Sequence, residues 1–211
     1  MMKEAVSAEL ARSGIVAILR GIEAAALPPL VAALYEGGIR LAEVTLNSPS
    51  ALAGIAALRQ AWGERMYIGA GTVLDAPSAR AAMDAGAQFI VAPNVAPDVI
   101  ACCQAQDRLV LPGALTPTEI ALALRLGCTY VKLFPARAMG PQYVRDVLGP
   151  LDGAKLLVVG GIDDANLPDY LAQGAVGAGV GGRLCRTPAD GDYAPITAQA
   201  RRLVAACARR G

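Results

Sequence analysis

The sequence predicts an α/β protein that folds as a single (β/α)8, or TIM, barrel over residues 1–211. Short apolar runs alternate with stretches of helical length eight times, and the units recur about every 20 to 26 residues. No shift in composition marks a linker between two domains. Regular alternation of strand and helix favours a parallel sheet, and eight repeats favour a closed barrel over the alternative, an open doubly wound sheet.

The eight expected strands are apolar runs bounded by glycine, proline or polar residues. They span residues 15–19, 41–46, 67–72, 89–93, 109–115, 130–135, 155–161 and 175–182. The run at 130–135 (YVKLFP) holds a lysine among apolar residues, which is unusual for a buried strand.

The expected helices lie between these strands, and several begin at a proline and end at a glycine. They span residues 24–36, 49–61, 76–85, 96–106, 117–126, 140–148, 164–172 and 193–209. Start signals occur at Ser48-Pro49, Thr116-Pro117 and Gly140-Pro141, and end signals at Gly37, Gly86, Gly127 and Gly174. Glu119, three residues after Thr116, also fits a capping box. The arginine-rich end of the chain should be a solvated helix face; its members are Arg201, Arg202, Arg209 and Arg210.

Composition excludes several classes of function. A net charge of +1 gives no field that would attract nucleic acid or an acidic membrane surface. The charged N-terminal segment lacks the apolar core of a signal peptide, and no apolar run approaches the roughly 20 residues of a membrane span, so a cytoplasmic protein is expected. The chain has no histidine, which removes the usual zinc ligand sets and serine triads, and its five cysteines should be reduced and mostly in the core.

Lys132, inside the YVKLFP run, is the most informative residue. Burying an ammonium costs several kcal/mol or lowers its pKa from about 10.4, and a neutral amine attacks ketones to form an imine. Of the other lysines, Lys3 lies in an N-terminal segment expected to be mobile, and Lys155 begins a strand, at the opposite end of a barrel. The residues alone leave three roles for Lys132: imine former, ion-pair partner or phosphate ligand.

Glu43 lies in the strand at 41–46, where alternation places it on the same face as Leu41 and Thr45. A carboxyl that faces into the barrel beside Lys132 would have a raised pKa and would suit proton transfer. An ion pair with Lys132 or Arg20 is the alternative, and the two roles are compatible.

Further candidates lie at the carboxyl ends of the strands, where barrel active sites form. Arg20 could bind a carboxylate through forked hydrogen bonds, or be an ordinary solvated arginine. The GAGT sequence that ends at Thr72 brings backbone and a hydroxyl toward a ligand, although tight packing explains it nearly as well. Gly160-Gly161 and the cluster at 179–182 follow the seventh and eighth strands, where backbone amides often bind phosphate; close packing of helix on strand is the alternative.

Nine short motifs occur in one order along the chain from about Ile15 to Arg186. They are ILRGI (18–22), EVTLNSP (43–49), IGAGTV (68–73), APN (92–94), PG (112–113), VKLFPA (131–136), GPQY (140–143), VGGI (159–162) and GAGVGG (177–182). In these motifs the sequence resembles the class I aldolases that cleave 2-keto-3-deoxy-6-phospho sugar acids, and their 6-phosphogalactonate branch most closely.

The resemblance implies a homotrimeric barrel lyase that uses neither metal nor cofactor. It implies that Lys132 forms the Schiff base, that Glu43 is the general acid and base, and that Thr72, Pro93 and Phe134 shape the pyruvate-binding end.

Two positions depart from the wider family. Related phosphogluconate aldolases carry a carboxylate-binding arginine where this chain has Asn47, and the NSP form resembles the galactonate branch, so Arg20 is expected to take over part of the anion binding. The family usually has Gly-Ser where this chain has Gly181-Gly182, which leaves only backbone donors there.

The resulting hypothesis is reversible cleavage of 2-dehydro-3-deoxy-6-phosphogalactonate to pyruvate and D-glyceraldehyde 3-phosphate. The gluconate epimer, or both epimers, is the alternative within the same class. A barrel isomerase or epimerase acting on a sugar phosphate would use the same glycine clusters without a covalent lysine. A non-catalytic barrel that binds phosphorylated metabolites is the third class.

Overall fold

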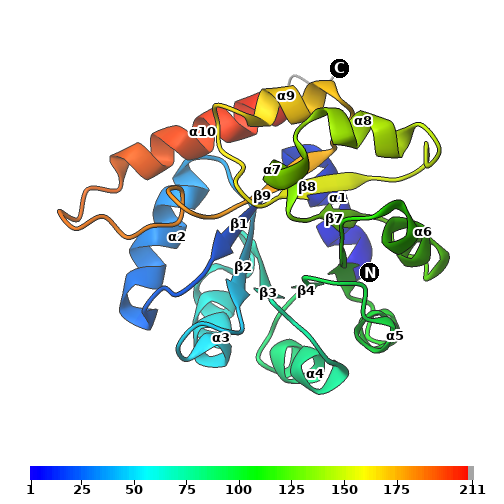
Figure 1. The fold of residues 1–211 in the computed structure, drawn as a ribbon. Helices are drawn as coiled ribbons and strands as arrows, with labels where there is room; N and C mark the ends of the chain where they lie inside the picture. The colour runs from blue at the N-terminus through cyan, green and yellow to red at the C-terminus, as the bar shows by residue number, and fades with distance from the viewer. Residues whose placement is uncertain (209–211) are drawn as a thin grey trace.

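A computed structural model describes residues 1–208, in which nine strand segments form one parallel sheet of order β5-β4-β3-β2-β1-β9-β8-β7-β6. The end segments β5 (Leu109–Leu111) and β6 (Gly113–Ala114) are separated only by Pro112. They act as one interrupted strand that pairs with β4 on one side and β7 on the other. The sheet therefore closes into the predicted eight-stranded barrel, ringed by helices (Figure 1).

Each remaining strand falls inside a predicted strand and is usually shorter at its carboxyl end. These strands are β1 (Ile15–Leu19), β2 (Leu41–Thr45), β3 (Tyr67–Gly71), β4 (Phe89–Val91), β7 (Val131–Leu133), β8 (Leu156–Val159) and β9 (Gly177–Val180). The residues beyond these ends turn toward the helices and form the rim of the barrel. The prediction of one unbroken strand at 109–115 is wrong at Pro112, which has no N–H to donate to a ladder.

The predicted helices are present, with ends shifted by a few residues. They are η1 (Ala24–Ala26) with α2 (Leu27–Glu36), α3 (Ala51–Trp62), α4 (Ala76–Asp84), α5 (Pro97–Ala105), α6 (Pro117–Arg125), α8 (Gln142–Leu148), α9 (Leu167–Ala172) and α10 (Ala194–Ala208). The predicted end of the last helix at 209, and the predicted exposure of Arg209 and Arg210, lie outside the described residues. The capping box of Thr116 and Glu119 is confirmed. In residues 1–208, no helix combines the length and apolar character needed to cross a bilayer.

The expectation of a mobile N-terminal segment is wrong. Met2–Ser13 form helix α1, which ends at Gly14 with a φ of 69°. The backbone N–H of Lys3 donates to the Asp107 carbonyl oxygen, just before β5. Val6 and Leu10 of α1 are buried in one cluster with the lower barrel interior. The helix therefore closes the amino-terminal end of the barrel.

Tyr130, at the start of the Lys132 strand, packs in the same cluster and donates its O–H to the Ser7 carbonyl oxygen of α1 over 3.3 Å. Lys155 also lies at this end, with its Nζ 5.5 Å from the centre of the Tyr130 ring. Both residues lie at the end opposite to the carboxyl ends of the strands, as predicted for Lys155.

Replacing Leu10 with alanine should destabilise the protein by about 2 to 5 kcal/mol, because Leu10 is only 1% exposed and its loss leaves a cavity under the barrel. Urea unfolding measures the change. Leu52→Ala on α3 is the matched control, since Leu52 is 41% exposed and should cost less than about 1 kcal/mol. Equal effects of the two substitutions would show that α1 does not close the core.

Candidate active site

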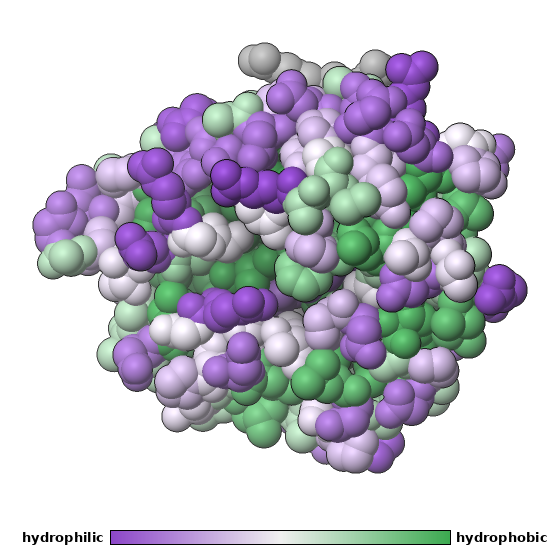
Figure 2. All heavy atoms as spheres, viewed as in Figure 1, coloured by the Kyte–Doolittle hydropathy of each residue, from purple (hydrophilic) through white to green (hydrophobic). Residues whose placement is uncertain are grey.

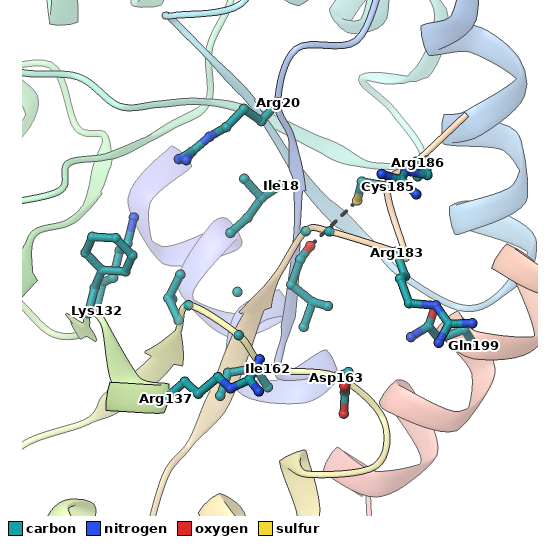
Figure 3. A pocket seen from close by; sticks show the side chains of 18 residues that line it. Ile18, Arg20, Lys132, Arg137, Ile162, Asp163, Arg183, Cys185, Arg186 and Gln199 are labelled. Atoms are coloured by element: carbon teal, nitrogen blue, oxygen red, sulfur yellow. Dashed lines mark hydrogen bonds between the residues drawn. The ribbon is translucent and has the colours of Figure 1, made fainter. Parts of the chain in front are cut away.

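A cavity of about 600 Å³ opens at the carboxyl ends of the strands, above β1, β7, β8 and β9. In Figure 2 it is seen as a hollow near the centre of the face, with apolar atoms inside and hydrophilic residues at its edges. A second, narrow pocket of about 10 Å³ continues into the barrel, and Lys132 lines both spaces. The side chains around the larger cavity come from widely separated segments of the chain (Figure 3).

Lys132 lies in the middle of β7, is 4% exposed, and has its Nζ 5.0 Å from the centre of the Phe134 ring. Burial is the main cause that lowers its pKa; the Glu43 carboxylate opposes this shift and the Arg20 guanidinium adds to it. A lowered pKa increases the fraction of neutral, nucleophilic amine at neutral pH. The strand thus places a buried lysine with a lowered pKa at the floor of the cavity.

Glu43 lies in β2, is 2% exposed, and lines the narrow pocket together with Lys132. Burial raises its pKa to about 7, against the opposing effects of Lys132 and Arg20. On the neighbouring strand, Gly71 makes room for this carboxyl, because a Cβ at Gly71 would collide with Glu43 Oε1. The ion pairs between side chains of residues 1–208 do not include Glu43. A carboxyl that titrates near pH 7 is suited to both donate and accept protons.

The glycine turns after β8 and β9 border the other side of the cavity. Gly160, Gly161 and Gly182 have φ angles of 97°, 76° and 56°, in the left-handed region that favours glycine. A Cβ at Gly160 would come within 3.1 Å of the Phe134 ring, so the backbone there approaches the Lys132 strand closely. Turns of this kind expose backbone N–H groups to an anion.

Side-chain hydrogen bonds fix the loops around the cavity. The Asn166 Nδ2 donates to the Gly161 carbonyl oxygen over 2.9 Å, and Asp163 Oδ1 accepts from the backbone N–H of Asn166 over 3.1 Å. Ser48 does not cap α3 as predicted, because that helix begins only after Ser50. Its Oγ instead accepts from the N–H of Gly21 over 2.8 Å, which ties the loop that carries Arg20 to the loop after β2.

The structure brings most of the predicted site residues together. Seven of them line the larger cavity: Lys132, Arg20, Phe134, Gly160, Gly161, Gly181 and Gly182. Glu43 does not line it but lines the narrow pocket, which shares Lys132 with the larger cavity. Asn47, Thr72 and Pro93 follow β2, β3 and β4 at the same end of the barrel, but within the described residues they lie outside the linings of both spaces. Thr72 has a φ of 58°, which is strained for a β-branched residue.

Three further arginines line the larger cavity and were not predicted. Arg137 lies on α7 (Ala136–Met139), a short helix that was also not predicted, and Arg183 and Arg186 follow the last glycine turn. Their position directly after the VKLFP and GVGG motifs was the available signal in the sequence. Single arginines in loops have no periodic pattern, so only the folded chain shows that they converge.

The structure is a parallel (β/α)8 barrel. A lysine and a carboxyl are buried below a cation-lined cavity at the carboxyl ends of its strands. Together these features define the architecture of a barrel lyase. The family model described as "KDPG and KHG aldolase" matches residues 6–199. The chain therefore belongs to the KDPG and KHG aldolase family, whose members are carbon–carbon lyases.

Three known proteins illustrate the relationship. The chain is 37% identical to a 2-dehydro-3-deoxy-6-phosphogalactonate aldolase of Escherichia coli (strain K12), over 82% of this chain and 84% of that one. It is 39% identical to a 2-dehydro-3-deoxy-phosphogluconate aldolase of Treponema pallidum (strain Nichols), over 81% and 82%. The crystal structure of the Legionella pneumophila KDPG aldolase, with pyruvate captured as a covalent carbinolamine, matches with a TM-score of 0.84 and 27% identity, over 93% of this chain and 96% of that one.

The raised pKa of Glu43 should make stability depend on pH. The native state holds the Glu43 proton more tightly than the unfolded chain, whose carboxyl has the ordinary pKa of 4.5. The protonated Glu43 therefore contributes to the free energy of unfolding below pH 4.5, and this contribution is lost as pH rises through about 7. The free energy of unfolding of Glu43→Gln, relative to that of the native protein, should therefore rise by about 3 kcal/mol between pH 4.5 and 7.5. Urea unfolding at several pH values measures the difference, and a constant difference would contradict the raised pKa.

Proposed function

We propose that the protein is a class I aldolase that reversibly cleaves 2-dehydro-3-deoxy-6-phosphogalactonate to pyruvate and D-glyceraldehyde 3-phosphate. The observation that carries this proposal is the burial of Lys132 and Glu43 in one narrow pocket that opens into the cavity. Membership of the KDPG and KHG aldolase family supports the reaction class. The galactonate name of the Escherichia coli relative supports the choice of epimer.

The substrate would lie with its keto acid end over Lys132 and its phosphate toward the glycine turns. Arg20 extends across the cavity toward Lys132 (Figure 3), where its guanidinium can bind the carboxylate through two hydrogen bonds. The backbone N–H groups of the Gly160 and Gly182 turns can bind the phosphate. We propose that Thr72 and Pro93 complete the pyruvate end from the rim and that Asn47 lies near the substrate.

Cleavage begins when the neutral amine of Lys132 adds to the C2 ketone, and loss of water from the carbinolamine leaves an iminium. Glu43, in its carboxylate form, takes the proton of the C4 hydroxyl while the C3–C4 bond breaks. The electron pair of that bond moves to the iminium nitrogen and gives an enamine, and the aldehyde leaves. Glu43, now protonated, gives its proton to C3, and hydrolysis of the resulting iminium releases pyruvate and restores the amine. The iminium is the electron sink for bond breaking, so the lysine supplies the required polarisation.

The gluconate epimer is the alternative substrate, because relatives of similar identity are named for each epimer. Both have the same keto acid and phosphate ends and differ in the configuration at C4. Since Asn47 and Gly182 lie away from that carbon in the proposed pose, they are indirect indicators of the epimer. The ratio of kcat/KM for the two compounds decides between them.

We also propose that residues 1–211 act as one domain, that three copies form a homotrimer, and that the enzyme works in the cytoplasm. The single closed sheet across residues 15–180 supports one domain. The family resemblance supports the trimer. No disulfide joins cysteines within the described residues, as is usual for a protein of a reducing compartment.

Glu43→Gln should lower kcat for pyruvate release at least roughly a hundredfold, because it removes the group that exchanges protons with the substrate. A coupled assay for pyruvate, run with each phosphorylated epimer, measures the effect. Glu36→Gln is the matched control, since Glu36 lies exposed at the end of α2. An unaltered kcat in the Glu43 variant would refute its role.

Two further measurements, of sugar-phosphate isomerisation and of ligand binding, separate the other classes of function. Full activity of Lys132→Ala on a sugar phosphate would favour an isomerase or epimerase that needs no covalent lysine. Binding of either phosphorylated acid without release of pyruvate would indicate a non-catalytic barrel.

A further inference from the structure

The larger cavity concentrates positive charge in a chain whose net charge is only +1. Its lining carries one carboxylate, that of Asp163, the amine of Lys132 and four guanidinium groups, those of Arg20, Arg137, Arg183 and Arg186. Within the described residues no hydroxyl side chain lines it. A Cβ at Gly182 would meet no atom within 4 Å, so that turn adds backbone but no side-chain donor. Any side-chain contribution to anion binding at this end must therefore come mainly from guanidinium groups.

Arg137 borders the first glycine turn from the side of the Lys132 strand. Its backbone N–H donates to the Gly160 carbonyl oxygen over 3.2 Å. Its methylene groups lie against Gly161, where an added Cβ would fall 2.5 Å from Arg137 Cδ. The stem is thereby held against the turn, while the residue as a whole is exposed and its guanidinium faces the cavity (Figure 3).

Arg183 borders the second glycine turn, because it directly follows Gly181 and Gly182. It points toward Gln199 of α10 (Figure 3), whose Nε2 donates to Asp164 Oδ1 over 2.7 Å. The ion pairs found between residues 1–208 include neither Arg137 nor Arg183. The two turns are thus flanked by guanidinium groups without a carboxylate partner in this part of the chain.

We propose that Arg137 and Arg183 are specificity-determining residues that hold a phosphomonoester dianion from two sides, above the N–H groups of the glycine turns. A planar guanidinium presents two parallel donors to phosphate oxygens, which suits it to this task. The inference rests on the proposed function, because it assigns these residues to the phosphate end of the same substrate. Arg20 then serves the carboxylate, at the opposite end of the cavity beside Lys132.

The test compares kcat/KM for 2-dehydro-3-deoxy-6-phosphogalactonate and for the same acid without its phosphate. Arg137→Ala and Arg183→Ala should each lower the ratio of these two values about tenfold, through KM of the phosphorylated compound, and the double variant about a hundredfold. Arg137→Gln and Arg183→Gln keep the first methylene groups and a polar end but lose the guanidinium, and should give the same loss. Arg145→Ala, an exposed arginine on α8 outside the cavity lining, should leave the ratio unchanged.

Equal losses of kcat/KM for the two compounds, or an unchanged ratio of the two kcat/KM values in the double variant, would overturn the inference. Either result would leave the aldolase assignment intact. Calorimetry with inorganic phosphate distinguishes failure of the arginine inference from failure of the proposed function. If the native protein cleaves neither compound, the proposed function is wrong. Weaker phosphate binding in the double variant than in Arg145→Ala would still support the inference about the arginine pair. Equal phosphate binding in the two variants would overturn that inference.

Discussion

The burial of Lys132 and Glu43 in one apolar pocket is the interaction on which the site depends. In water each group would be charged at neutral pH; in the barrel, desolvation lowers the pKa of the amine and raises that of the carboxyl to about 7. Each opposes the shift of the other, so their pKa values are set together. Gly71 gives the carboxyl its space, and both side chains are at most 4% exposed.

The rest of the cavity surrounds this buried pair with positive charge. Loops anchored by side chains, such as Asn166 on Gly161 and Ser48 on Gly21, hold the glycine turns and Arg20 in place before a ligand arrives. Preorganised donors around a substrate reduce the reorganisation needed during the reaction. In the proposed mechanism the architecture separates two tasks: covalent chemistry inside the barrel, and recognition of the anionic ends of the substrate at its rim.

The barrel and the burial of Lys132 within it could be predicted because their signals are local: apolar runs, glycine and proline boundaries, and a lysine within a strand. Other features depend on the folded chain. Helix α1 has few apolar residues, and only its contact with the open end of the barrel shows its role. Ser48 has the sequence of a helix cap, yet Gly21 offers it a tertiary partner. The convergence of Arg137 and Arg183 follows from loop geometry that no sequence period encodes.

The most direct test of this account is reductive trapping with pyruvate. Incubation with pyruvate and borohydride should add one reduced pyruvate to the protein, and peptide mapping should place it on Lys132. Lys132→Ala should remain unmodified, although Lys3 and Lys155 are still present and serve as internal controls. An unchanged mass of the native protein, or a label on either of those two lysines, would contradict the claim that the barrel activates Lys132.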